Sequence, residues 1–217
     1  MKNDALLLYR TNSFAYFFSI CVLLSLINYF INHYYLTEEL FFNTYSEQLS
    51  FDRISALFKN VKSHSFAYYI MTPLFFLVQI SYNTLFIGAF SYLILNRIEM
   101  KKIFNVCLKA EIVFLVMLLA KVLFLQFFVN IHTVYDLNFI PLSLLNLFSS
   151  AHIPLWLNYP LQTINIWEVL FVLLASFYFS VAYDIPFKKG LTVIGIGYAS
   201  GLFIWLLVVL FIQLQFS

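Results

Sequence analysis

Charged residues are scarce in this chain of 217 residues, and their scarcity excludes a water-exposed globular surface. Asp, Glu, Lys and Arg make up 10% of the sequence, whereas a soluble domain carries about 25%. Hydrophobic residues make up 63%, and the mean hydropathy is +0.89. A surface with this composition must face lipid rather than water, so we expect an integral membrane protein in contact with the bilayer.

Signatures of catalysis and metal binding are also missing. The two cysteines, Cys21 and Cys107, fall in or near apolar runs, which argues against a disulfide framework. The four histidines are scattered, and no spacing matches H-E-x-x-H or a zinc-binding Cys/His set. There is no Walker loop, no G-x-G-x-x-G and no G-x-S-x-G. We therefore expect no enzymatic activity, no metal, no cofactor and no nucleic-acid partner.

Long apolar runs are what the sequence does contain. A helix of roughly 20 apolar residues crosses a bilayer, and five runs reach that length. They predict an all-α transmembrane bundle that forms a single domain over residues 1–217. The predicted spans cover residues 13–36, 66–95, 104–131, 164–183 and 191–214. No A-x-A-like site follows the first run, so we expect it to be retained rather than cleaved as a signal peptide.

The distribution of lysine and arginine predicts the orientation, because cytoplasmic loops are enriched in both. Five spans place the termini on opposite sides. One side then holds Lys2, Arg10, Arg97, Lys101, Lys102, Lys109, Lys188 and Lys189, and the other holds Arg53, Lys59 and Lys62. This excess places the N-terminus in the cytoplasm and the C-terminus outside, and we expect a bacterial inner membrane.

The two long outer connections, residues 37–65 and 132–163, have patterns of their own. In the first, apolar residues recur at helical spacing from Phe51 to Val61, after a potential cap at Ser50. They predict a short amphipathic helix that lies either on the outer leaflet or on the protein's own outer face. The second contains three prolines and is too apolar for a free loop. It forms either a re-entrant segment or a structured cap over the bundle.

Lys121 lies near the middle of the third predicted span, where a charge costs about 2.5–3.5 kcal/mol on insertion scales. Glu111 on the same helix is too distant to pair with it, about 15 Å along the axis. Glu168, or a backbone carbonyl freed by Pro73, is a closer candidate partner. Lys121 marks an ion, substrate or proton pathway, or else it forms a structural pair or snorkels.

Glu111 and Glu168 are the other intramembrane polar candidates. Glu111 lies about two turns inside the third span. Its candidate partners are the cations near the inner surface, Lys188, Lys189 and Arg97. A structural ion pair is the favoured interpretation for Glu111.

Four of the five glycines lie in residues 190–201, at the start of the last predicted span. Gly197 and Gly201 form G-x-x-x-G, and Gly190 lies on roughly the same helix face. Small residues let helices approach closely in lipid. This face packs against another span of the same chain, or it binds a second copy or a membrane-protein partner.

Three stretches carry a family resemblance: KKIFNVCLKAEIVFL at 101–115, NYPLQTINIWEVLF at 158–171 and PFKKGLTVIGIGYASGLFIWLLVVLF at 186–211. In these the chain resembles the Yip family of five-span membrane proteins, including short bacterial members sometimes labelled permeases. The resemblance implies a five-helix bundle with a cytoplasmic N-terminus and supplies no catalytic residue. Eukaryotic relatives bind small GTPases through a long cytosolic N-terminal region, whereas residues 1–12 alone precede the first predicted span here.

Two functions are consistent with these features. The first is a non-enzymatic scaffold or accessory subunit of a membrane complex, which would use the glycine face. The alternative is a small transporter or channel subunit that uses Lys121. An intramembrane enzyme ranks last, because it needs a cluster of titratable groups within hydrogen-bond reach.

Overall fold

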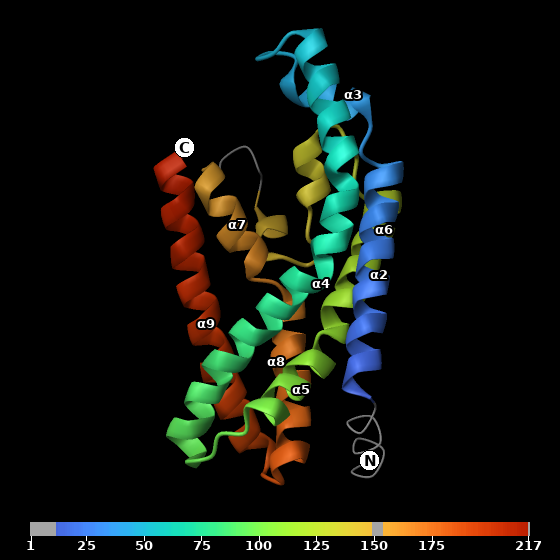
Figure 1. Cartoon of the computed structure of the whole chain (residues 1–217). Coiled ribbons are helices and arrows are strands. Elements are labelled where there is room, and N and C mark those ends of the chain that lie inside the picture. The colour runs from blue at the N-terminus through green and yellow to red at the C-terminus, as the bar shows by residue number, and fades with distance from the viewer. Residues whose placement is uncertain (1–11, 149–153, 217) are drawn as a thin grey trace. The chain divides into compact units, whose positions relative to one another are not determined.

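The fold is helical throughout the part of the chain that a computed structural model describes, residues 12–148 and 154–216 (Figure 1). Within these ranges the structure has no strand, and Ser143 and Asn165 form an isolated bridge. The all-α prediction is therefore confirmed. The chain divides into two compact units: Met1–Phe17, Phe76–Phe114 and Leu142–Ser217 form the first, and Phe18–Phe75 and Leu115–Pro141 form the second.

Four helices among the described residues are long and apolar enough to cross a membrane. They are α2 (Ser13–Tyr34), α4 (Phe51–Leu95), α8 (Ile166–Tyr183) and α9 (Phe187–Phe216). They contain four of the five predicted spans. Large apolar side chains such as Phe203 and Phe211 of α9 are exposed over most of their surface, 62% and 69%. Exposed apolar faces of this extent suit contact with lipid.

The third predicted span, residues 104–131, is divided between two helices in the structure, and its crossing of the membrane stays a prediction. The structure has α5 (Met100–Ala110) and α6 (Ile112–Phe127), which meet at Glu111. The Phe114 N–H donates to the Glu111 carbonyl, 3.0 Å away and three residues earlier, which tightens the turn as in a 3-10 helix. Neither proline nor glycine lies at the break.

The predicted short amphipathic helix is not a separate element. Its residues form the first turns of α4, which continues without a break into the second predicted span. No glycine or proline separates the two segments. Instead, Ser63 and Ser65 donate their hydroxyls to the carbonyls of Asn60 and Lys62 three residues back, at 2.8 and 2.6 Å. These local bonds are compatible with helix, and so nothing ends α4 there.

The first turns of α4 pack within the second unit. Ile54 is 1% exposed and belongs to a small core with Leu36, Phe41 and Leu137. This core also involves α3 (Glu38–Tyr45) and η1 (Val134–Asn138). The Val134 N–H donates to the Thr44 hydroxyl at 2.9 Å. Ile54 and Phe58 thus contact the protein's own residues, whereas Phe51, Leu57 and Val61 of the same segment are exposed.

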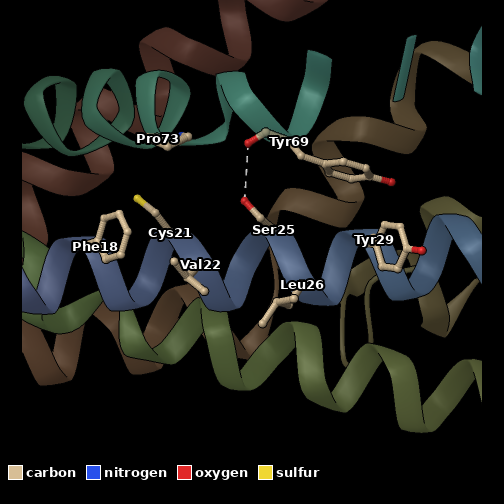
Figure 2. A pocket seen from close by; sticks show the side chains of 8 residues that line it. All are labelled: Phe18, Cys21, Val22, Ser25, Leu26, Tyr29, Tyr69 and Pro73. Atoms are coloured by element: carbon tan, nitrogen blue, oxygen red, sulfur yellow. Dashed lines mark hydrogen bonds between the residues drawn. The ribbon is translucent and has the colours of Figure 1, made fainter. Parts of the chain in front are cut away.

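Pro73 lies inside α4 and has no N–H to donate to the carbonyl of Tyr69. Figure 2 shows the Ser25 hydroxyl of α2 aimed at that carbonyl, 3.5 Å away. Asn32 of α2 also donates to the Tyr69 hydroxyl, at 3.1 Å. The carbonyl of Tyr69, which Pro73 frees and which was a candidate partner for Lys121, therefore accepts a hydrogen bond from Ser25.

In the first unit, α8 and α9 lie side by side and antiparallel, and α5 packs against α8 (Figure 1). Close packing of α8 and α9 depends on Gly190, where a Cβ atom would collide with the Ser180 hydroxyl and lie 2.9 Å from the Ser176 carbonyl oxygen. The helix α7 (Leu155–Thr163) and the turn η2 (Leu144–Leu147) complete the unit, and α7 contacts α9.

Candidate functional site

Asn165 joins two helices and positions Glu168. Its Oδ1 atom accepts the N–H of Glu168 at 3.0 Å, which caps the start of α8. Its Nδ2 atom donates to the carbonyls of Gln162 and Thr163, at 3.0 and 3.1 Å, at the end of α7. One buried side chain therefore satisfies the ends of both helices, and Glu168 lies in the first turn of α8.

Tyr198 of α9 contacts Glu168 directly. Its hydroxyl donates to Oε2 of Glu168 in a short hydrogen bond. The Tyr198 ring is 7% exposed and lies against Phe171 of α8, with ring centroids 4.8 Å apart. The phenol is thus held between α8 and α9 with its donor on the carboxylate.

Glu111, at the break between α5 and α6, brings a second carboxylate to the same place. Its side chain is 2% exposed. Gln79 of α4 donates to Oε2 of Glu111 at 3.5 Å, while Oε1 is buried without a hydrogen-bond partner. The carboxylate is close enough to Glu168 to interact electrostatically, and both Tyr198 and the Cys107 thiol lie within the same range of it.

No ion pair to either glutamate occurs among residues 12–148 and 154–216. The predicted pairing of Glu111 with Lys188, Lys189 or Arg97 is therefore corrected: Gln79 is its partner. The nearby ammonium of Lys109 lies over the Tyr16 ring, 4.0 Å from its centroid.

Helix lengths locate this cluster along its helices. At 1.5 Å per residue, Glu168, Tyr198 and Gln79 lie about 22, 17 and 24 Å from the adjacent ends of α8, α9 and α4, where the loops 184–186 and 96–99 connect the chain. The hydrocarbon core of a bilayer is about 30 Å thick. A membrane crossed by these three helices would therefore enclose the cluster.

The glycine face of α9 positions Tyr198, which lies between Gly197 and Gly201. A Cβ atom at Gly197 would be 2.9 Å from the Cα atom of Ile87, and one at Gly201 would be 3.1 Å from the Phe86 ring. Both contacts are with α4, which carries Gln79 six or more residues earlier in the chain. The predicted packing face is thus in contact with the chain's own helices.

Sequence reasoning found the two carboxylates and missed their partners. Glu111 and Glu168 were candidates, and the structure brings them together. Gln79 and Tyr198 were not candidate site residues, because neither side chain is charged and Tyr198 is one of 15 tyrosines. Lys121 lies half-buried in α6 within the second unit, whereas Glu168 belongs to the first. Pairing between Lys121 and Glu168 stays a prediction.

A separate groove lies between α2 and α4 in the second unit (Figure 2). Its volume is about 290 Å³, and its surface is apolar. It is lined by Phe18, Cys21, Val22, Ser25, Leu26, Tyr29, Tyr69 and Pro73. Such a surface suits contact with a lipid chain and offers little for chemistry.

The glutamate pair can exchange a proton or another small cation. The residues around the pair limit which cation can bind. In the described ranges, no group of three or more His, Cys, Asp or Glu could hold a metal ion.

Comparisons with protein-family models, curated proteins and solved structures found no match for the chain. The resemblance to the Yip family and the expected lack of enzymatic activity therefore stay predictions.

Proposed function

We propose that this chain is a five-span membrane protein that acts as a small transporter or channel subunit. Its cation-binding site comprises Gln79, Glu111, Glu168 and Tyr198. One observation carries the proposal: a buried carboxylate, Glu111, and a half-buried one, Glu168, lie on different helices, interact electrostatically and have no ion-pair partner among the described residues. Ionisable groups at such depth are costly and typically serve ion or proton pathways.

The five crossings combine the four long apolar helices with a third crossing formed by α5 and α6. Helix α6 alone is about 24 Å long, short of a core of about 30 Å, and α5 supplies the remainder. Because this third crossing breaks at Glu111, the Glu111 carboxylate can point into the interior of the bundle. Transporters commonly place their binding sites at such interrupted helices. The lysine and arginine distribution then places the N-terminus in the cytoplasm.

The segment before α8 acts as a cap in this arrangement. The indole N–H of Trp205 in α9 donates to the Tyr159 hydroxyl of α7 at 2.8 Å. Trp205 lies about 27 Å from the start of α9. Tryptophan and tyrosine are enriched at bilayer interfaces, so this pair supports a position of α7 at the outer boundary of the core.

The scaffold hypothesis relied on the glycine face as a docking surface. Gly197 and Gly201 contact α4, and Gly190 contacts α8, all within the chain. A partner cannot use this face without displacing those helices. The glutamate site is thus the stronger basis for a function, and we place it, rather than Lys121, at the centre of the transporter hypothesis.

Cation flux into liposomes tests the proposal. The purified full-length protein is reconstituted, a membrane potential is applied, and uptake of H⁺, Na⁺ and K⁺ is measured separately. We expect at least one flux in the wild type that is lost in Glu111→Gln/Glu168→Gln. The matched control is Glu99→Gln, which removes an exposed carboxylate paired with Lys102 at 2.8 Å. Absence of all three fluxes, or equal flux in the double variant, would overturn the proposal.

A further inference from the structure

We infer that the ligand of this site is the proton, and that Glu111 and Glu168 hold one proton between them. The inference deepens the proposed function by naming its cation. It rests on the hydrogen bonds among the four side chains, because the two carboxylates have different hydrogen-bond partners. The proton resides on Glu111, and Glu168 carries the negative charge.

Glu111 lies where an ionised carboxylate has least support. One oxygen receives a long hydrogen bond from the Gln79 amide, 3.5 Å, and the other is buried without a partner. A buried charge without partners costs many kcal/mol, and such a group neutralises instead. A proton on Glu111 removes the charge and supplies a donor where the carboxylate has none.

Glu168 has the support that Glu111 lacks. The Tyr198 hydroxyl donates to its Oε2 atom, and hydrogen bonds to an ionised group are stronger than those between neutral groups. Glu168 also lies in the first turn of α8, where the helix dipole favours negative charge. Two carboxylates that interact electrostatically away from water cannot both ionise at low cost, so the charge remains on the better supported one.

Four groups that interact with the pair from other helices are uncharged at pH 7. They are Gln79 from α4, Tyr16 from α2, Cys107 from α5 and Tyr198 from α9. The nearby cation, the Lys109 ammonium of α5, lies over the Tyr16 ring, 4.0 Å from its centroid. Among the described residues, no lysine, arginine or histidine forms an ion pair with either glutamate. The pair therefore has no ion-pair partner in that set, and a proton on one carboxyl group avoids a second buried charge.

A metal ion fits these side chains poorly. Calcium takes six to eight oxygen ligands, and magnesium requires six in near-ideal geometry. Here the amide N–H of Gln79 and the O–H of Tyr198 point at one oxygen of each carboxylate. Each donor occupies an oxygen that a metal would need. A proton uses the remaining oxygen without displacing either donor.

Infrared spectroscopy of the purified full-length protein tests this assignment. We expect the C=O stretching band of an un-ionised carboxyl group at pH 7, present in the wild type and in Glu99→Gln. The band should be absent from Glu111→Gln/Glu168→Gln at that pH. In Glu168→Gln the remaining carboxyl, Glu111, no longer has a charged neighbour, so the pH at which its band disappears should be lower than in the wild type by about one unit or more.

Three results would overturn the inference: no such band in the wild type at pH 7, a band that persists in the double variant, or an unchanged midpoint of the band in Glu168→Gln. Should the double variant fail to fold, carbodiimide labelling of the wild type still decides the matter. Dicyclohexylcarbodiimide modifies un-ionised carboxyl groups in apolar surroundings, and we expect mass spectrometry to locate it on Glu111 and not on Glu99. An unmodified Glu111 would contradict the inference.

The outcome is separable from that of the proposed function. A carboxyl band that behaves as described, without flux in liposomes, would support the shared proton and exclude transport. Flux of sodium or potassium without the band would support transport and exclude the proton as the ligand.

Discussion

At the scale of single residues, the hydroxyl of Tyr198 is the donor on which the Glu168 charge depends. We predict that Tyr198→Phe lowers the free energy of unfolding in detergent by about 1.5–3 kcal/mol, the usual contribution of a hydrogen bond to a charged group. Tyr92→Phe is the control, because Tyr92 is 57% exposed on α4. Equal stability of the two variants would show that the Tyr198 bond contributes nothing.

Individual residues also show what sequence could and could not supply. Glu111 and Glu168 stand out because charges are rare in apolar runs. Their meeting could not be predicted, since a helix was expected to continue through Glu111 and carry it towards the lysines of the inner surface. Gln79 became a partner only when the break at Glu111 redirected the carboxylate towards α4.

At the scale of elements, Asn165 links α7 to α8. Asn165→Ala removes the cap of α8 and both hydrogen bonds to α7, so we predict a loss of about 0.5–2 kcal/mol in the free energy of unfolding. Asn165→Ser keeps an oxygen that can cap α8 but has no amide N–H for α7. We expect an intermediate loss in chemical denaturation, and wild-type stability of the alanine variant would contradict the assigned role.

The glycines of α9 provide a matched pair of substitutions. A Cβ atom at Gly197 would lie 2.9 Å from the Ile87 backbone, whereas one at Gly195 would meet nothing within 4 Å. We predict that Gly197→Ala destabilises the protein by about 1–3 kcal/mol through overpacking. Gly195→Ala should stabilise it by about 0.5–1 kcal/mol, because alanine loses less conformational freedom in a helix. Thermal unfolding in detergent measures both, and the reverse order would contradict this packing.

Helices were predictable to the extent that apolar length defines them. The runs that became α2, α8 and α9 are uninterrupted, and their positions followed from hydropathy. The joined α4 and the broken α5–α6 did not follow. In α4, local serine bonds let a polar stretch remain helical, and at Glu111 a tight turn separates α5 from α6 within an apolar stretch. Hydropathy contains neither effect.

At the scale of the whole molecule, five crossings predict opposite locations for the two termini. Both native cysteines are buried, so they are first replaced by alanine to give a background without thiols. We expect an impermeant thiol reagent to label Glu47→Cys and Gln215→Cys in intact cells, and to leave Lys188→Cys unlabelled. Labelling of Glu47→Cys without Gln215→Cys would indicate four crossings and would contradict a crossing by α5 and α6.

The proton flux through reconstituted protein at a fixed membrane potential tests the central role of the glutamate pair most directly. We predict that the wild type, Glu99→Gln and Lys121→Leu carry comparable flux, because neither substitution alters the pair, and that Glu111→Gln/Glu168→Gln carries none above protein-free liposomes. A double variant that conducts protons as fast as the wild type, or a Lys121→Leu variant that alone loses the flux, would contradict the assignment of the pathway to Glu111 and Glu168.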